Sequence, residues 1–156
     1  MHLRMITVGK LKEKWLRDGY EEYAKRLGRY CRLELIELPE ARLPEHPSGG
    51  EIACALESEG KEILKRCEGK VIALCIEGKP CSSEQLAQKI EAFAQQCGTI
   101  CFIIGSSFGL HESVKQRADF RLSMSPMTFT HQIARVLLSE QIYRAYQIMT
   151  GGKYHK

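Results

Sequence analysis

Strand-like apolar runs alternate five times with helical stretches along this 156-residue chain. Two of the runs, residues 71–76 and 99–104, are almost wholly apolar, which is typical of strands covered on both faces of a sheet. The alternation predicts an α/β fold with a mostly parallel sheet and helices on both faces. No internal repeat, low-complexity tract or interdomain linker is present, so we expect residues 1–156 to form a single domain.

The position of each element follows from hydrophobic periodicity, glycine stops and capping residues. We expect strands at residues 3–8, 33–38, 71–76, 99–104 and 120–124. We expect helices at residues 11–28, 52–67, 83–97, 111–118 and 131–149. In the first of these helices, the apolar stripe includes Trp15 and Leu16. Residues 39–50, with three prolines and two glycines, should form a loop, and residues 77–80 a turn.

The last predicted helix, residues 131–149, is apolar on much more than one face. Its large apolar residues are Ile133, Val136, Leu137, Leu138, Ile142, Tyr143, Tyr146, Ile148 and Met149. A helix that is apolar nearly all round must be buried nearly all round. In so small a domain a subunit interface would complete that burial, which favours a two-fold homodimer. A central helix in a monomer is the alternative.

Basic residues gather at the start of the chain, although the formal net charge is only +4. Nine of them lie within the first 32 residues: Arg4, Lys10, Lys12, Lys14, Arg17, Lys25, Arg26, Arg29 and Arg32. A basic face of this kind can attract a phosphate backbone, so it favours a nucleic-acid partner. A solvated helix of mixed charge is the alternative, because acidic residues are interspersed.

Cysteine usage and the N-terminus indicate a reducing, cytoplasmic environment. The seven cysteines form no CxxC pair and no zinc-finger spacing, so neither a disulfide framework nor a bound metal is expected. No charged-then-apolar signal segment opens the chain, and no apolar run is long enough to cross a bilayer. We therefore expect no association with a membrane.

Two loops that follow predicted strands have the composition of a ligand site. In the segment Gly105-Ser-Ser-Phe-Gly109, glycines allow the backbone to approach a ligand, and neighbouring N–H groups can bind it. The second loop, Ser125 to Thr130, offers the apolar surfaces of Met127 and Phe129, which suit an adenosine moiety. Ligands bind outside the carboxyl ends of strands in open α/β sheets, so these loops predict a small-molecule pocket.

Other residues of the last third are candidates for chemistry. Thr130 is a plausible N-cap of the last helix, and His131 is interpreted as a structural, hydrogen-bonding histidine. Arg135 and Arg144 lie on the same helix and would pair with Glu140 or contact phosphate. The glycines lack the spacing of a phosphate-binding or dinucleotide-binding loop, so ATP and NAD have little support.

The whole chain resembles the RlmH family, ribosomal RNA large subunit methyltransferases of the SPOUT class. The segments that carry the resemblance are Val8-Gly9-Lys10-Leu11-Lys12, Glu77-Gly78-Lys79, Tyr143-Arg144-Ala145 and Tyr154-His155-Lys156. The resemblance implies an α/β knot, with a C-terminal trefoil knot and an obligate homodimer. It also implies methylation of N3 of a pseudouridine in 23S rRNA of the assembled ribosome, with S-adenosylmethionine as the methyl donor.

The resemblance assigns roles to residues of three loops. The residues expected to bind the cofactor are Leu74, Gly105, Met124, Ser125, Pro126, Met127, Thr128 and Phe129. An imide nitrogen must lose its proton before it attacks, and a neighbouring positive charge favours the anion. We expect Arg144 or Arg135 to supply that charge, His155 to handle the proton and Tyr154 to stack on the base.

Two positions depart from the usual family pattern. Ser106 stands where a second glycine is usual, and Thr130 stands where a proline is usual. Because both positions lie in the expected cofactor loops, a second hypothesis is a non-catalytic, ribosome-associated RNA-binding factor that retains the fold. Such a factor would not bind the methyl donor.

Overall fold

The computed structural model describes residues 1–156 and contains one five-stranded sheet in which every neighbouring pair of strands is parallel. The strands are β1 (His2–Val8), β2 (Arg32–Leu38), β3 (Lys70–Pro80), β4 (Thr99–Ile104) and β5 (Phe120–Ser123), in the order β2-β1-β4-β3-β5. The helices are α1 (Lys14–Leu27), α2 (Gly49–Leu64), α3 (Ser83–Gln96), α4 (Glu112–Arg117) and α5 (His131–Met149). The predicted α/β fold with a parallel sheet is confirmed.

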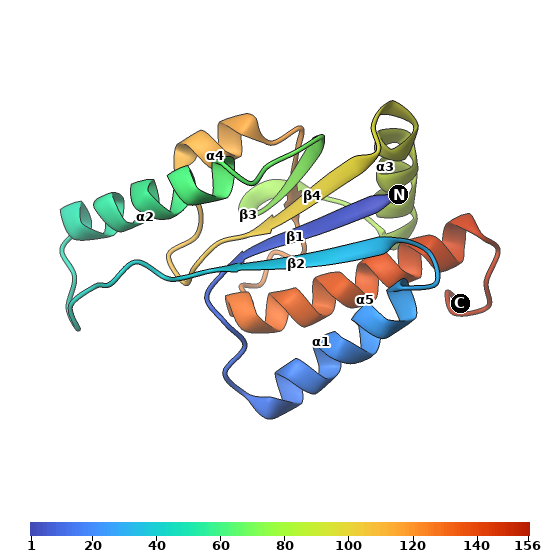
Figure 1. Ribbon diagram of the computed structural model, residues 1–156, viewed down its shortest axis with the longest axis horizontal. Helices are drawn as coiled ribbons and strands as arrows, with labels where there is room; N and C mark the ends of the chain where they lie inside the picture. Colours follow the sequence, from blue (N-terminus) through green and yellow to red (C-terminus); the bar gives the residue numbers. More distant parts are fainter.

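Helices cover both faces of the sheet (Figure 1). Side chains alternate along β1, so that Leu3 and Met5 join a core with α1, α3 and α5. Ile6 and Val8 point the other way, into a smaller core with α2 and α4. Because β4 lies at the centre and is buried on both faces, its apolar run has no alternation, as the sequence predicted.

The end of β3 differs from the sequence prediction. Residues 77–80 were expected to form a turn, whereas β3 continues to Pro80. The cause is a non-local pairing, because Leu122 of β5 pairs with both Leu74 and Lys79 of β3. Gly78 lies tightly against β5, where a Cβ atom would meet the carbonyl oxygen of Arg121 at 2.8 Å.

Two helices begin at other residues than expected. The first starts at Lys14, after a short connection in which Leu11 is buried. The second starts at Gly49, within the predicted loop, because Ser48 and Glu51 form a capping box.

Helix α5 packs between the sheet and its neighbours α1 and α3 (Figure 1). Leu137 is its one exposed large apolar residue. A single chain therefore achieves most of the burial that the helix's apolar surface requires, and the homodimer stays a prediction. The trefoil knot also stays a prediction. None of the helices has the length and apolarity needed to cross a membrane.

Candidate active site

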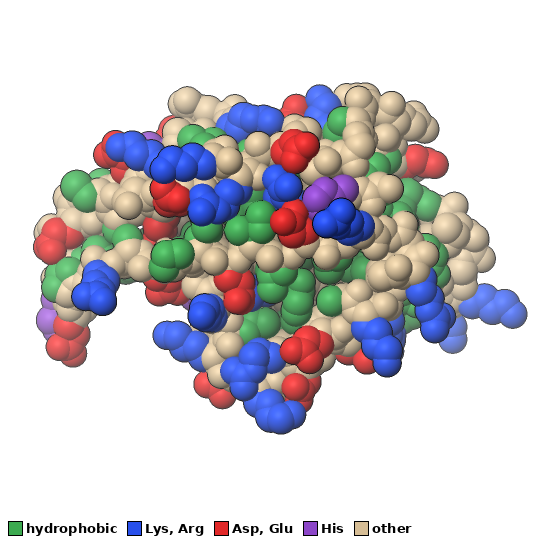
Figure 2. All heavy atoms as spheres, viewed as in Figure 1, with side chains coloured by type: hydrophobic (Ala, Val, Ile, Leu, Met, Phe, Trp, Pro, Cys, Tyr) green, Lys and Arg blue, Asp and Glu red, His purple; other side chains and the backbone are tan.

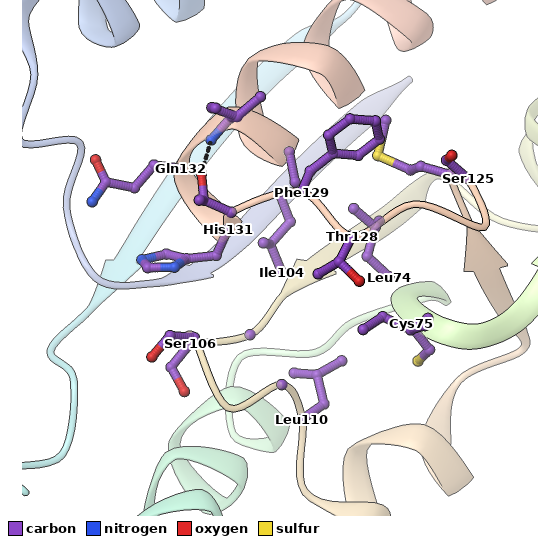
Figure 3. A pocket seen from close by; sticks show the side chains of 18 of the residues that line it. Leu74, Cys75, Ile104, Ser106, Leu110, Ser125, Thr128, Phe129, His131 and Gln132 are labelled. Atoms are coloured by element: carbon purple, nitrogen blue, oxygen red, sulfur yellow. Dashed lines mark hydrogen bonds between the residues drawn. The ribbon is translucent and has the colours of Figure 1, made fainter. Parts of the chain in front are cut away.

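A cavity of about 850 Å³ opens at the carboxyl ends of β3, β4 and β5, beside the start of α5. Figure 3 shows its walls, to which β3 contributes Leu74 and Cys75, and the loop before α5 contributes Thr128 and Phe129. The cavity thus occupies the edge at which open α/β sheets bind ligands.

The residues expected to bind the cofactor gather around this cavity. Seven of the eight line it: Leu74, Gly105, Met124, Ser125, Met127, Thr128 and Phe129. Pro126 belongs to the same loop as five of these residues but does not line the cavity. The structure therefore brings together β3, the turn after β4 and the loop before α5, as expected for these residues.

The turn after β4 is built around two glycines. Gly109 has a φ of +87°, and its N–H donates to the carbonyl oxygen of Ser106 over 2.9 Å. Gly105 has no room for a side chain, since a Cβ atom would lie 2.2 Å from the Gly109 carbonyl oxygen. The N–H groups of Ser107 and Phe108 donate to no backbone carbonyl, so they remain free to bind a ligand.

The loop before α5 is held by its own side chains. Ser125 Oγ accepts from the backbone N–H of Met127 over 3.0 Å. Thr130 Oγ1 accepts from the backbone N–H of Ile133 over 3.3 Å, which confirms Thr130 as the N-cap of α5. The hydroxyl of Thr130 thus caps the helix, and Thr130 also lines the cavity.

The rim of the cavity is unusually apolar. Seven large hydrophobic residues are exposed on the molecule, and five of them line the cavity: Trp15, Ile76, Phe108, Met127 and Phe129. Trp15 was expected in the buried stripe of the first helix, but it is 63% exposed while its neighbour Leu16 is buried. Such a cluster is typical of a ligand-binding or interaction site.

One ion pair of the cavity was not identified from the sequence. Lys115 donates a hydrogen bond to Glu77, and this contact holds the pKa of Glu77 below its usual range. His131 Nε2 lies 3.4 Å from Glu40 Oε1 but forms no hydrogen bond, so the hydrogen-bonding role expected for this histidine is not confirmed. Burial raises the pKa of the Cys75 thiol, which therefore stays protonated and offers apolar surface. No group of three or more His, Cys, Asp or Glu side chains is placed to hold a metal ion.

Arg135 lies inside the protein rather than in the cavity. Its side chain is 1% exposed. It forms an ion pair with Glu37 and donates from Nη2 to the carbonyl oxygen of Gly9 over 2.7 Å. These contacts tie α5 to the ends of β1 and β2.

The other three predicted catalytic residues meet at the far end of α5. Arg144 donates from Nε and Nη2 to Glu140 Oε1, at 3.1 and 2.6 Å. Its guanidinium carbon lies 4.7 Å from the centre of the Tyr154 ring, and its Nη1 lies 3.4 Å from His155 Nδ1. The Tyr154 hydroxyl donates to Glu140 Oε1 over 3.1 Å. We call Glu140, Arg144, Tyr154 and His155 the C-terminal cluster.

The contacts of the C-terminal cluster favour a charged Arg144 and a neutral Tyr154. The hydrogen bond to Glu140 raises the pKa of Arg144 above its already high value. Burial, followed by hydrogen bonds to Tyr23 and Glu140, raises the pKa of Tyr154, so its hydroxyl remains protonated. His155 Nε2 contacts Glu84 Oε1 at 2.7 Å, which anchors the tail to α3.

Known proteins resemble this chain over its full length. Residues 1–155 match the family described as "Predicted SPOUT methyltransferase". The chain is 52% identical to the ribosomal RNA large subunit methyltransferase H of Bifidobacterium adolescentis, with both chains covered in full. It is 48% identical to the protein of the same name from Clostridioides difficile, again with both covered in full.

Solved structures support the fold. A probable methylase family protein from Haemophilus influenzae aligns with a TM-score of 0.59 at 15% identity, covering 99% of this chain and 70% of that one. A probable methyltransferase from Bordetella pertussis aligns with a TM-score of 0.55 at 15% identity, covering 92% of this chain and 95% of that one. At such low identity these likenesses show a shared fold alone.

Proposed function

Because the chain belongs to the SPOUT methyltransferase family, we propose that it methylates N3 of a pseudouridine in the 23S rRNA of the ribosome, in the cytoplasm. The chain is an S-adenosylmethionine-dependent rRNA methyltransferase. The observation that supports 23S rRNA as the substrate is the sequence identity of 48–52%, over the full length of both chains, to relatives named ribosomal RNA large subunit methyltransferase H. The cavity described above supports it.

The cavity has the features that the methyl donor requires. Its apolar walls, including Leu74 and Phe129, suit the adenine ring, and Gly105 permits the tight turn after β4, because a Cβ atom there would collide with the backbone of Gly109. The free N–H groups of Ser107 and Phe108 are donors for the polar parts of the ligand. When bound, S-adenosylmethionine supplies a methyl group on a positively charged sulfur, so the protein needs no metal or covalent intermediate.

The C-terminal cluster has the groups that the acceptor nitrogen requires. Arg144 carries a positive charge that would stabilise the N3 anion. His155 lies beside Arg144 and is the candidate acceptor of the N3 proton. The ring of Tyr154 offers a surface on which a base can stack. Positioning of these groups in line with the methyl donor then accounts for catalysis.

Within one chain the cavity and the C-terminal cluster are far apart. His131 lines the cavity, and Arg144 follows thirteen residues later on the same helix, about 20 Å along its axis. A two-fold homodimer resolves this separation by placing the C-terminal cluster of one subunit at the cavity of the other. The exposed apolar rim and Leu137 are surfaces that such a partner would cover.

The rRNA would be held by the basic residues near α1. Lys10, Lys12 and Lys14 are exposed close to Trp15 at the cavity rim. Figure 2 shows one face of the molecule on which lysine and arginine side chains are interspersed with acidic ones. The contact is therefore expected to depend on a few lysines rather than on a uniformly basic surface.

Mass mapping of 23S rRNA tests the function. RNA from cells that lack the gene should lose one methyl group on a single pseudouridine, and the gene supplied in trans should restore it. An unchanged map would contradict the proposed substrate. Calorimetric titration with S-adenosylmethionine tests the non-catalytic alternative, which predicts no binding.

Mixed dimers test the shared site. Gly105→Ala should disable the cavity and His155→Ala the C-terminal cluster, so each variant alone should be inactive. If each site uses both subunits, a mixture of the two variants regains up to one working site per mixed dimer. A mixture that stays inactive after subunit exchange would show that each chain works alone.

A further inference from the structure

Glu59 on α2 is a buried carboxylate with two hydrogen bonds and no cation. Its residue is 7% exposed. Oε2 accepts from Ser106 Oγ over 3.0 Å, and Oε1 accepts from the backbone N–H of Ala41 over 3.0 Å. No lysine, arginine or histidine lies within salt-bridge distance of it. Burying a carboxylate is costly unless hydrogen bonds compensate, so both bonds matter to the folded state.

One of these bonds leads to the wall of the cavity, although neither Glu59 nor Ala41 lines it. Ser106 is part of the wall, at the start of the turn between Gly105 and Gly109. Ala41 belongs to the segment that follows β2, and the preceding residue, Glu40, contacts His131 at the start of α5. The carboxylate of Glu59 therefore connects the glycine turn to the segment that supports the start of α5.

The glycine turn has few bonds of its own to hold it in place. The backbone hydrogen bond from the Gly109 N–H to the Ser106 carbonyl oxygen is the one hydrogen bond within the turn, and Gly109 adopts a φ of +87°. Glycines at both ends permit many other conformations of the backbone. A hydrogen bond to a buried charge restricts that freedom more than a bond between neutral groups.

We propose that Glu59 is a positioning residue for the methyl donor, because through Ser106 Oγ it holds the glycine turn in the conformation that binds S-adenosylmethionine. This inference rests on the proposed function, which makes the cavity the donor site. Ser106, which stands where the family usually has a second glycine, then contributes to donor binding, since its hydroxyl forms the link to Glu59.

The test compares dissociation constants of S-adenosylmethionine, measured by calorimetry, for variants on both sides of the link. Ser106→Ala and Glu59→Ala should each weaken binding about tenfold, the effect of losing one charge-assisted hydrogen bond. Glu59→Gln should bind the donor more tightly than Glu59→Ala but less tightly than wild type, because a neutral amide can still bond both partners but more weakly than a carboxylate. The matched control is Glu57→Gln, an exposed carboxylate on the same helix that pairs with Lys61.

A double variant separates positioning from general stability. If Glu59 acts through Ser106, the combined Ser106→Ala and Glu59→Ala variant should bind no more weakly than either alone. Turnover at saturating donor should stay within about twofold of wild type while the KM for the donor rises. If Glu59→Ala fails to fold, the donor affinity of Ser106→Ala alone tests the proposal, because this variant keeps the hydrogen bond between Glu59 and Ala41.

Three outcomes would overturn the inference: additive losses of affinity, wild-type affinity in Ser106→Ala, or lower stability with an unchanged dissociation constant. Each of these outcomes differs from a failure of the proposed function. If the proposed function were wrong, the wild-type protein itself would not bind S-adenosylmethionine.

Discussion

The guanidinium of Arg135 donates to the carbonyl oxygen of Gly9 across 2.7 Å in the interior of the protein. Together with the ion pair to Glu37, this bond fixes α5 to the ends of β1 and β2. Arg135 directly follows the first four residues of α5, which line the cavity. Arg135 was one of two arginines expected to supply positive charge to the substrate. Its burial favours Arg144 for that role.

Replacement of Arg135 should therefore be costly to stability. In Arg135→Leu the Gly9 carbonyl and Glu37 lose their partner, and we expect the free energy of unfolding to fall by about 3 kcal/mol. This is the lower end of the usual range for a broken buried pair, because Glu37 keeps contact with water. Urea denaturation at neutral pH measures the change.

The control for Arg135 is an exposed arginine with no side-chain hydrogen bond. Arg29→Leu should change the free energy of unfolding by less than about 0.5 kcal/mol. Equal effects of the two substitutions would show that the contacts of Arg135 contribute nothing specific.

Gly105→Ala should abolish binding of the methyl donor. A Cβ atom at this position would lie 2.2 Å from the Gly109 carbonyl oxygen, so the turn must change shape. We expect the dissociation constant to rise at least about a hundredfold. The chain's single tryptophan, Trp15, lies at the cavity rim, so its fluorescence reports binding directly.

Gly98→Ala is the matched control for Gly105→Ala, because a Cβ atom at Gly98 would meet nothing within 4 Å. It should bind the donor with wild-type affinity. Tight binding by Gly105→Ala would place the donor somewhere other than this cavity.

Most of the fold follows from local sequence signals, and the exceptions have non-local causes. The unbroken apolar run of β4 predicts a central strand because both of its faces are covered by helices. The last residues of β3 gave no such signal, since their strand geometry depends on pairing with Leu122, more than forty residues later. The start of α2 was not predicted because glycine is a poor helix former and the helix begins with Gly49 and Gly50. The capping box of Ser48 and Glu51 nevertheless starts the helix there.

The site divides in the same way. The cofactor loops follow from the rule that ligands bind at the carboxyl ends of strands, so seven expected residues meet there. Trp15 was misplaced because helical periodicity cannot decide which of two adjacent apolar residues faces the core. Glu59 gave no signal, since an acidic residue on an amphipathic helix usually faces solvent.

His155→Ala should lower turnover without affecting the donor. His155 is proposed to accept a proton from the base rather than to bind the donor, so the dissociation constant of S-adenosylmethionine should stay at the wild-type value. Loss of a general base typically lowers the rate by about 10² to 10⁴. Single-turnover methylation of ribosomes measures the rate, with Lys153→Ala, an exposed tail residue, as control. Wild-type turnover in His155→Ala would remove this residue from the mechanism.

Charge reversal near α1 should weaken ribosome binding in a salt-dependent way. Lys12 and Lys14 are exposed, whereas Arg17 donates to the carbonyl oxygens of Leu11 and Lys12 and so also has a structural role. The Lys12→Glu and Lys14→Glu double variant should bind the ribosome more weakly than wild type. In a plot of log affinity against log salt concentration, its slope should be shallower by roughly one for each lost phosphate contact. Parallel salt plots for variant and wild type would show that these lysines do not contact phosphate.

The carboxylate of Asp119 should make stability depend on pH. It accepts from the backbone N–H of Val71 over 2.8 Å and pairs with Lys70 and Arg117. Partial burial opposes its ionisation, but the bonds to Val71 and Lys70 outweigh this effect and lower its pKa. Since the folded-state pKa lies below the unfolded value of about 3.9, this stabilisation is complete at neutral pH. It is lost as the pH falls through the folded-state value.

Asp119→Asn should therefore lower the free energy of unfolding by about 1 kcal/mol at pH 7, because a neutral acceptor replaces a charged one. The difference from wild type should shrink steadily below about pH 4, where the wild-type carboxylate also becomes protonated. Urea denaturation between pH 3 and pH 7 measures both curves. A difference that stayed constant over this range would mean that the charge of Asp119 does not stabilise the junction between β3 and α4.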